Sequence, residues 1–496
     1  MTIFIHAYRS FSMRYIIGTD IFKTLISSNY QIIIFVLEED SQYFTDIFKN
    51  TSVIVESVHY KELFSNLRKN RIRNFLNLLR VLTYGRQSTL INTNISIYKL
   101  NYKKQFLHGF GIFIYKLITI SSFITCNSIL ARKVLSFLLS ISFKGRIYDK
   151  YFEKYNPETL IISSLGYGID LHMMHAAKRH KCRIISIPHS WDNPTTKGYR
   201  GPKPDLVFAW TNRMATEIAA FHDLPKNIIK VSGIAHWDDY FNGTLILNNK
   251  DSFIIKHNLD PNKKVLFYAL SGPANFEKRL QVIEGILDII KNLTSNYNLQ
   301  LLVRFHPLHI QRHPSGATWM ELHENDIRAL KMKYGNLVTF WVPTEPHKNQ
   351  INQLGMSDMH DMASAIHYSD ILIQEYSTLI LESTIFDKPT INISMFPYRQ
   401  TYHSNILATL IHLQYILKYD TSTTIQTFEE LKTTIFKYLD NPEIKQNERR
   451  KLFNNELNIN TGSAGDFIGN SILKYMDDLT LDKPTLPNLN ISNQEL

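Results

Sequence analysis

Short runs of Ile, Val, Leu and Phe recur along the chain, and most are followed by a segment with helical spacing. Gln31–Leu37, for example, reads QIIIFVL, and Lys264–Ala269 reads KVLFYA. Continuous apolar runs of this length are typical of parallel strands whose two faces are both covered by helices. Strand, helix and strand in repeated succession therefore predict an α/β protein built from doubly wound parallel sheets.

The strand and helix pattern occurs in two series separated by a polar stretch. Asn242–Lys250 reads NGTLILNNK and carries the turn residues of a linker. A chain of 496 residues is too long for one ordinary domain and suits two. We predict one Rossmann-like domain over residues 1–245, a second over residues 246–480, and a loose tail at 481–496. The expected strands are Ile3–Ala7, Gln31–Leu37, Leu160–Ser163, Arg183–Ile187, Leu206–Trp210, Ile229–Ser232, Lys264–Ala269, Gln300–Phe305, Val338–Trp341, Ile371–Gln374 and Thr390–Ile393.

Positive charge is concentrated in one block of the first domain. The whole chain has 55 Lys and Arg against 44 Asp and Glu, a formal net charge of +11. Residues 61–150 contain 16 of these cations, and their only acids are Glu62 and Asp149. The rest of the chain is close to neutral. This distribution argues against a general nucleic-acid coat and for one local anionic partner, such as a membrane face or an acidic substrate.

Part of this basic block, which we expect to form a helical insertion, has amphipathic spacing. Over Lys69–Leu82 the apolar side chains fall on one helical face and Lys69, Arg73 and Arg80 on another. Such a helix can lie in the interface of an anionic membrane, although a solvated helix face carries the same pattern. We assign Arg73 and Arg80 to contact with an acceptor or a membrane surface.

The cysteine content and the N-terminus indicate where the protein works. Cys126 and Cys182 are the only cysteines, too few for a disulfide framework. The first residues, MTIFIHAYRSF, run into a strand-like pattern without the apolar core of a signal peptide. Leu117–Ala131, the longest uncharged stretch of the basic block, is shorter than the roughly 20 residues of a spanning helix. We expect a cytoplasmic protein that meets a membrane, if at all, as a peripheral protein on the inner face of the plasma membrane.

In open parallel sheets, ligands bind beyond the carboxyl ends of the strands. This rule selects the polar loops Arg9–Arg14, Leu165–Gly168, His189–Gly198, Ser271–Lys278, His306–His313 and Gln374–Thr378.

The strongest motif lies in Ser369–Pro389, SDILIQEYSTLILESTIFDKP, where a strand leads into Ser377 and Thr378. Two hydroxyls and free N–H groups at a helix start favour an anion such as a diphosphate. Glu382 lies about one turn further on the same side, where a carboxylate can hold a vicinal diol such as a ribose. Simple capping by Ser377 and a solvated Glu382 would explain the same residues.

Two further loops carry groups suited to phosphate. Arg304 and His306 stand in RFHP at the end of a predicted strand, where a guanidinium and an imidazole suit phosphate oxygens. Gly272, in SGPANFEK, permits close approach of the backbone to a phosphate.

The sequence predicts no metal or other cofactor. Pro307 and Pro314 break the helix that would align His306, His309 and His313 as ligands. The chain contains no Asp-x-Asp, no Walker A motif and no His-Glu-x-x-His. GYGIDL, at residues 166–171, lacks the third glycine of a dinucleotide-binding loop, so an oxidoreductase is disfavoured.

These motifs resemble those of GT-B glycosyltransferases and their relatives over roughly residues 161–393. The most similar patterns are those of surface-carbohydrate and capsule transferases, CDP-glycerol glycerophosphotransferases and UDP-N-acetylglucosamine 2-epimerases. In these relatives an Arg-x-His-Pro loop contacts nucleotide phosphates, and a Ser-containing turn followed by an acid binds diphosphate and ribose. The resemblance implies a GT-B architecture, two Rossmann-like domains facing a cleft, with a donor site at Arg304, His306, Ser377, Thr378 and Glu382. To this site we add Gly272.

The resemblance further implies metal-independent transfer of a sugar from a nucleotide-sugar donor to a surface-glycan acceptor, for which we expect a lipid-linked glycan. Such a transfer needs a base on the N-terminal side of the cleft, and His189 and Asp192 in PHSWDNPTTKG are the candidates. A plain turn before Pro194 would also explain Asp192. Glycerophosphotransferases have His-Gly where this chain has His189 and Ser190.

Three other functions remain open at this point. A non-hydrolysing sugar-nucleotide 2-epimerase shares the fold. A CDP-glycerol-type glycerophosphotransferase would use the same Arg-x-His-Pro loop. An inactive GT-B module would bind nucleotide without turnover.

Overall fold

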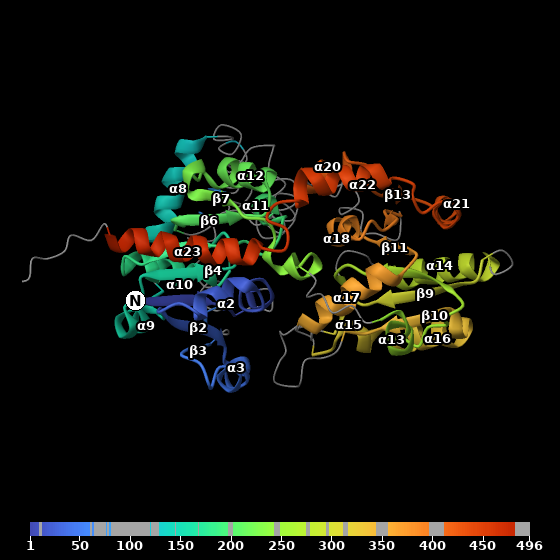
Figure 1. Cartoon of the computed structure of the whole chain (residues 1–496), viewed down its shortest axis with the longest axis horizontal. Helices are drawn as coiled ribbons and strands as arrows, with labels where there is room; N and C mark the ends of the chain where they lie inside the picture. The colour runs from blue at the N-terminus through green and yellow to red at the C-terminus, as the bar shows by residue number, and fades with distance from the viewer. Residues whose placement is uncertain are drawn as a thin grey trace, which may run out of the picture.

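The computed structural model shows two α/β lobes side by side (Figure 1). The first lobe is formed by residues 1–242 and 464–481, and the second by residues 249–457. The structure describes residues 1–8, 12–59, 62–63, 76, 79–80, 120, 128–143, 145–166, 168–196, 202–242, 249–273, 278–293, 297–310, 316–343, 356–395 and 411–481.

The first lobe contains a seven-stranded parallel sheet in the order β3-β2-β1-β4-β5-β6-β7. Alternate residues of β1 enter different cores, with Ile3 and Ile5 on one face and Phe4 on the other, so apolar side chains are required on both faces. The strands are β1 (Thr2–His6), β2 (Gln31–Leu37), β3 (Ile54–Val58), β4 (Thr159–Ile162), β5 (Arg183–Ser186), β6 (Leu206–Ala209) and β7 (Ile229–Val231). The accompanying helices are α2 (Asp20–Ile26), α3 (Ser41–Ile47), α8 (Ile129–Ile141), α9 (Asp149–Tyr155), α10 (Asp170–Arg179), α11 (Asn193–Thr196) and α12 (Asn212–His222).

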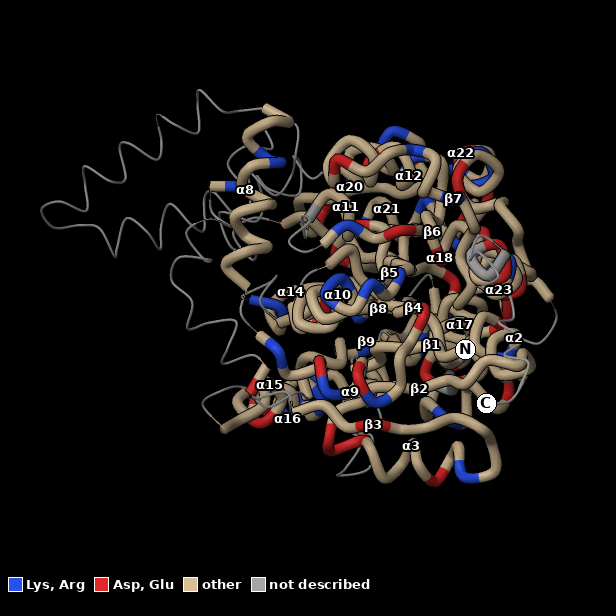
Figure 2. The backbone as a smooth tube through the Cα atoms, turned by 90° about the vertical axis from the view of Figure 1, so that its left-hand side faces the viewer, with Lys and Arg blue, Asp and Glu red and all other residues tan. Residues whose placement is uncertain are grey.

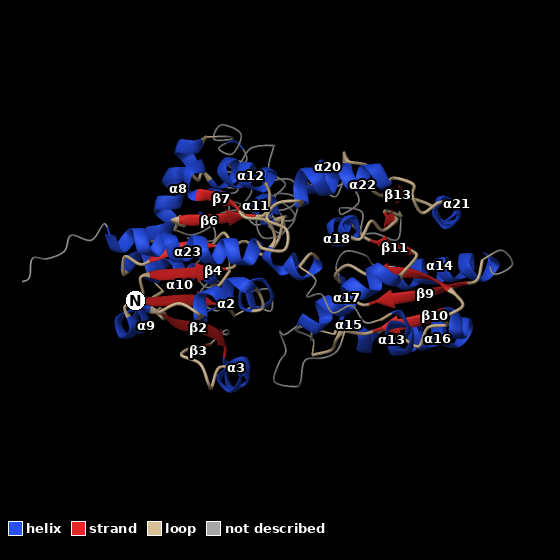
Figure 3. Ribbon diagram, in the orientation of Figure 1, coloured by secondary structure: helices blue, strands red, loops and turns tan. Residues whose placement is uncertain are grey.

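The second lobe contains a six-stranded parallel sheet in the order β10-β9-β8-β11-β12-β13, and helices cover its faces (Figure 3). Its strands are β8 (Lys264–Ala269), β9 (Leu299–Arg304), β10 (Val338–Trp341), β11 (Ile371–Gln374), β12 (Thr390–Ile393) and β13 (Thr423–Ile425). Its helices are α13 (Lys250–Lys256), α14 (Arg279–Leu293), α15 (Trp319–Leu322), α16 (Glu324–Tyr334), α17 (Met356–Tyr368), α18 (Leu379–Ile385), α20 (Ile411–Leu417), α21 (Phe428–Asp440) and α22 (Gln446–Leu452).

The prediction of two doubly wound parallel sheets is confirmed. In the first sheet the strand order reverses between β1 and β4, and in the second between β8 and β11. Open α/β sheets bind ligands beyond the carboxyl ends of the strands at such reversals. The topology therefore predicts a ligand site among the loops that follow these four strands.

The C-terminal helix α23 (Ala464–Leu481) returns to the first lobe, which differs from the predicted boundary of residues 246–480. Its apolar side chains Ile468, Ile472 and Met476 recur at helical spacing and are buried in the core beside α2. Figure 1 shows α23, in red, lying across the blue and green elements. Burial of this stripe explains why the segment leaves the second lobe. The predicted tail lies outside the described residues from 482 onward.

The two lobes meet in a shared apolar cluster. Trp210 and Met214 of the first lobe pack with Leu381 and Ile416 of the second. The same contact contains a pocket lined from both sides. The lobes are therefore in direct contact along the edge where the strands of each sheet end.

Most of the basic block, including Arg73, lies outside the described residues. Arg80 is described and is only 2% exposed, so it does not lie on the exposed cationic face that the helical pattern predicts. Its charge is close enough to His222 and Lys203 to affect the pKa of each. In the described ranges, no helix has both the length and the apolar character needed to cross a membrane.

Candidate functional site

Loops from the carboxyl ends of both sheets come together between the lobes. Tyr240, which follows β7, donates a hydrogen bond to Glu382 on α18 at 2.9 Å. Thr195, which follows β5, is 2.9 Å from the Nδ1 atom of His412. Strand ends of the two sheets therefore face each other, and polar groups of both lobes line the contact.

Glu382 lies at this contact, and its ribose-binding role stays a prediction. Its side chain is nearly buried, and burial raises its pKa, whereas the nearby guanidinium of Arg14 opposes this shift. Arg14 comes from η1 (Met13–Ile17), the irregular turn after β1, so it approaches from the opposite lobe. The positions of Arg14 and Tyr240 were not predicted, although Arg14 ends one of the selected loops.

Ser377 and Thr378 lie in the turn before α18 rather than inside the helix. The Ser377 hydroxyl donates to Gln374 Oε1 at 2.9 Å and accepts from the backbone N–H of Leu379 at 3.2 Å. Thr378 has helical backbone angles and makes no capping bond with its side chain. The helix begins two residues later than the pattern suggests because Ser377 bonds locally. Diphosphate binding by these hydroxyls stays a prediction.

Arg304 stands at the carboxyl end of β9, where the RFHP motif places it. One nitrogen, Nη2, donates to both carboxylate oxygens of Asp358, at 2.8 and 3.0 Å. The guanidinium also stacks over the ring of Trp341 at 4.9 Å. Asp358 therefore balances the charge of Arg304, and it is a neighbour that sequence reasoning missed.

His306 is held as a neutral imidazole. Burial lowers its pKa to about 4, and the charge of Arg304 adds to this effect. The Nδ1 atom accepts a hydrogen bond from the backbone N–H of Leu308 at 3.1 Å. In a neutral ring the proton must then be on Nε2. His306 therefore presents an N–H donor at Nε2.

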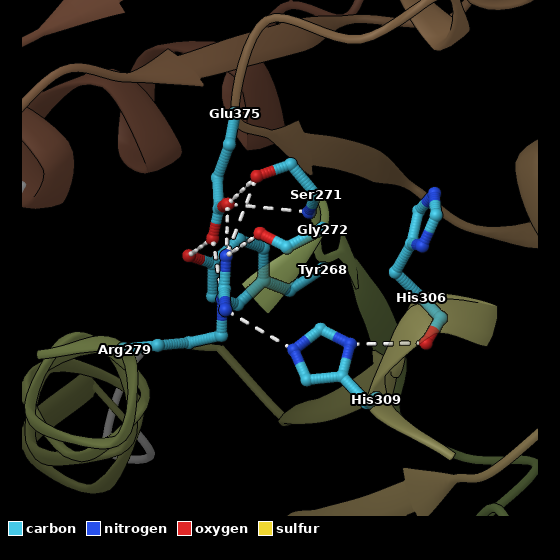
Figure 4. Close-up of polar contacts among 7 residues, drawn as sticks. All are labelled: Tyr268, Ser271, Gly272, Arg279, His306, His309 and Glu375. Atoms are coloured by element: carbon cyan, nitrogen blue, oxygen red, sulfur yellow. Dashed lines mark hydrogen bonds and ion pairs between the residues drawn. The ribbon is translucent and has the colours of Figure 1, made fainter. Parts of the chain in front are cut away.

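A buried ion pair between Arg279 and Glu375 joins the loops around this site (Figure 4). Glu375 directly follows β11 and accepts hydrogen bonds from Tyr268 at 2.6 Å and from both the backbone and the hydroxyl of Ser271. Arg279 begins α14 and donates to the carbonyl of Gly272 at 3.2 Å. Burial alone would raise the pKa of Glu375, but Arg279 and the hydrogen bonds keep it below its usual value.

The same pair extends through His309 to the backbone of His306. Arg279 Nη1 is 3.1 Å from His309 Nε2, and His309 Nδ1 is 3.0 Å from the carbonyl of His306. A guanidinium can only donate, so Nε2 accepts and the imidazole proton is on Nδ1. Burial lowers the pKa of His309 to about 3, which agrees with this neutral form. Figure 4 shows the His306 ring pointing away from this network. One buried hydrogen-bond network therefore holds the backbone of both Gly272 and His306 in position.

His189 and Asp192 lie on the first-lobe side of the contact. The His189 Nδ1 atom is 2.5 Å from the carbonyl of Ser163, so a neutral ring has its basic nitrogen at Nε2. Asp192 accepts hydrogen bonds from Ser190 and Asn193 at the start of α11. The carbonyl of Ser163 thus fixes the orientation of the His189 ring, and its role as a base stays a prediction.

Tyr15 lies near candidate site residues of both lobes. Burial raises its pKa to about 12, and the carboxylates of Glu382 and Asp192 both add to the rise. Its ring also contacts His236 edge to face, with centroids 3.9 Å apart. The aromatic ring therefore lies near the candidate base loop and near the candidate ribose-binding acid.

The described side chains offer no evident metal centre. Within those ranges, no group of three or more His, Cys, Asp or Glu is arranged to hold a metal ion. Metal-independent chemistry stays a prediction.

No protein-family model matches the chain, and no curated protein matches it either. Among solved structures, MnaA from S. aureus in complex with UDP is 13% identical, with 97% of this chain and 98% of that chain covered and a TM-score of 0.53. A candidate UDP-N-acetylglucosamine 2-epimerase from Listeria monocytogenes is 10% identical, with 96% and 97% covered and a TM-score of 0.52. A further UDP-N-acetylglucosamine 2-epimerase is 10% identical, with 96% of each chain covered and a TM-score of 0.51. The likeness extends over almost the whole chain and confirms the expected GT-B architecture.

Proposed function

We propose that this protein is a GT-B glycosyltransferase that moves a sugar from a nucleotide-sugar donor to a surface-glycan acceptor, with a lipid-linked glycan as the expected acceptor. The observation that carries the proposal is the position of Tyr15, whose ring centroid is 6.1 Å from that of His189 and whose pKa is raised by the carboxylates of both Glu382 and Asp192. A donor-binding acid and a candidate base then flank the same contact, with Tyr15 between them. The epimerase-like fold adds the general expectation of a nucleotide-sugar ligand.

The donor would lie against the second lobe. Glu382 accepts hydrogen bonds from the ribose hydroxyls, since a buried carboxylate with a raised pKa still has two acceptor oxygens when it is ionised. The Nε2–H of His306 and the guanidinium of Arg304 stabilise the negative charge of the leaving diphosphate. Gly272, Ser377 and Thr378 border the same loops, where backbone and hydroxyl groups can approach the phosphates.

The acceptor would approach from the first lobe. Its hydroxyl oxygen forms the new bond to the anomeric carbon as the bond from that carbon to the diphosphate oxygen breaks. The hydroxyl proton passes to His189 Nε2, which the bond to Ser163 leaves as the basic nitrogen. Asp192, the second candidate base, follows three residues further along the same loop.

A nucleotide panel tests the donor proposal. Purified protein is heated with UDP, CDP, GDP or CMP, and the transition temperature is recorded by thermal shift. Binding of one nucleotide should raise this temperature by mass action. No shift with any nucleotide at millimolar concentration would overturn the proposed donor site. A selective shift with CDP would favour the glycerophosphotransferase alternative.

The likeness to 2-epimerases makes epimerisation the second candidate function. An epimerase acts on its nucleotide sugar without an acceptor, whereas a transferase releases nucleotide only as acceptor is consumed. Incubation of UDP-N-acetylglucosamine with protein alone, followed by chromatography of the sugar, separates the two. An accumulating epimer would replace transfer as the conclusion. Nucleotide binding without turnover on any acceptor would indicate an inactive module.

A further inference from the structure

Helix α8 presents a continuous apolar stripe to solvent. Leu130, Val134, Phe137 and Ile141 recur at steps of four, three and four residues, which places them on one helical face. Leu130 is 72% exposed and Phe137 is 66% exposed. Along a helix this stripe is roughly 16 Å long. Contiguous exposed apolar surface of this kind marks an interaction site more often than scattered single residues do.

The opposite face of α8 is anchored to the first lobe, so the stripe cannot simply rotate inward. Arg132 donates to both carboxylate oxygens of Asp223 at 2.8 Å, and the two side chains are largely buried. Leu139 is buried on the same side of the helix. The Ser128 hydroxyl caps the first turn by accepting from the N–H of Ala131 at 3.1 Å. Figure 2 shows α8 at one margin of the described part of the molecule.

The charge beside the stripe is positive. Lys133 is exposed between Leu130 and Val134, and α8 contains no acid. Lys203 is also exposed and lies near enough for the charges of Lys133 and Arg80 to act on its pKa. Asp223, the acid in this neighbourhood, has its carboxylate engaged by Arg132.

We propose that α8 docks on an anionic lipid surface, with its apolar stripe at the level of the acyl chains and with Lys133 and Lys203 at the phosphates. A helix that is apolar on one face and cationic at the margin lies parallel to such an interface. The net positive charge of the sequence over residues 61–150 favours anionic lipid over a second copy of the chain, because two segments of like charge repel each other. The inference concerns membrane attachment and does not depend on which reaction the site performs.

Vesicle co-sedimentation of the full chain tests the proposal. One set of vesicles contains equal parts of phosphatidylcholine and phosphatidylglycerol, and the other contains phosphatidylcholine alone. We expect binding to the anionic vesicles that weakens with salt. The double variant L130S/F137S should lower the partition coefficient about tenfold or more. K133E should lower it as well, by several-fold, through loss of attraction to the headgroups.

The matched control is I255S/M332S, which removes two equally exposed apolar side chains from the second lobe. It should bind vesicles like the unaltered protein, and circular dichroism should show all variants folded. Equal binding by L130S/F137S and the unaltered protein would overturn the proposal. The proposal would also be overturned if light scattering showed that L130S/F137S converts a dimer to a monomer while vesicle binding stays unchanged.

Discussion

Arg279 and Glu375 form an ion pair that is shielded from solvent, with Nε and Nη2 of the guanidinium donating to different carboxylate oxygens at 3.2 and 2.8 Å. Glu375 follows β11, and Arg279 follows the loop after β8, so the pair spans the point where the second sheet reverses its strand order. Through Gly272 and His309 it fixes the loops after β8 and β9 relative to each other. We infer that it positions the donor site without touching the donor.

Replacement of Arg279 by Met should destabilise the protein strongly. The substitution leaves the Glu375 carboxylate buried without its cation, which costs about 3–5 kcal/mol. Urea denaturation monitored by circular dichroism measures the free energy of unfolding. Arg328→Met is the matched control because the Arg328–Glu324 pair is exposed at both ends. This control should change stability by about 0.5 kcal/mol or less. Equal effects of the two variants would contradict the structural role of the buried pair.

Glu382→Gln should weaken nucleotide binding if this carboxylate holds the ribose. Loss of hydrogen bonds to a charged acceptor costs about 1.5–3 kcal/mol, which is about tenfold or more in affinity measured by calorimetry. Tyr240→Phe removes the bond between the lobes but leaves the carboxylate in place. It should therefore retain most of the affinity. If both variants lost the same nucleotide affinity, Glu382 would affect binding through its hydrogen bond between the lobes. The ribose assignment would then be wrong.

His306 should act as a neutral hydrogen-bond donor. His306→Phe removes the Nε2–H and should weaken nucleotide binding about tenfold, whereas His306→Gln retains an N–H donor and should lose less. Calorimetry with the nucleotide selected by the thermal-shift panel makes the comparison. If the two variants bind equally well, the donor role of the imidazole is wrong.

The buried His222 should make stability depend on pH. Burial lowers its pKa from 6.5 to about 4. The unfolded chain therefore binds a proton at His222 between these values while the folded chain does not. The neutral His222 therefore makes its full contribution to the free energy of unfolding above pH 6.5. This contribution is lost as the pH falls toward 4, by at most about 3 kcal/mol. His222→Gln, which does not titrate, should show a smaller fall in unfolding free energy between pH 7 and 5. An unchanged fall would contradict this assignment.

Several strands could be predicted closely because their apolar runs are short, continuous and bounded by polar residues. β2, β8, β10, β11 and β12 have the bounds that the sequence indicates. Two of the four edge strands, β3 and β13, were missed, whereas the edge strands β7 and β10 were predicted. Most side chains of β3 are only half-buried, so IVESV lacks a continuous apolar run, and β13 has three residues.

Residues of the candidate site could be predicted only where charged or polar side chains lie at the end of a strand or soon after it. Arg304, His306 and Glu382 were found from their places after strands or on the next helix. Arg279 and Glu375 are 96 residues apart, and no local spacing indicates that they pair. Such long-range partners depend on sheet order, which sequence patterns leave open.

Local sequence patterns likewise could not predict that α23 packs against the first lobe, and this contact yields the last prediction. Asp238, buried after β7, accepts from the backbone N–H of Ala464 at 3.0 Å and of Gly465 at 2.7 Å. Asp238→Ala leaves two buried donors at the start of α23 without a partner and should cost about 2–3 kcal/mol of unfolding free energy.

Asp466→Ala is the control on the same helix, since Asp466 bonds Thr24 at an exposed position. It should stay within about 0.5 kcal/mol of the unaltered protein in the same urea titration. Asp238→Asn keeps one acceptor oxygen and should fall between the two. If Asp238→Ala matched Asp466→Ala, the buried carboxylate would not be what fastens α23 to the first lobe, and the apolar stripe of Ile468, Ile472 and Met476 would have to do so alone.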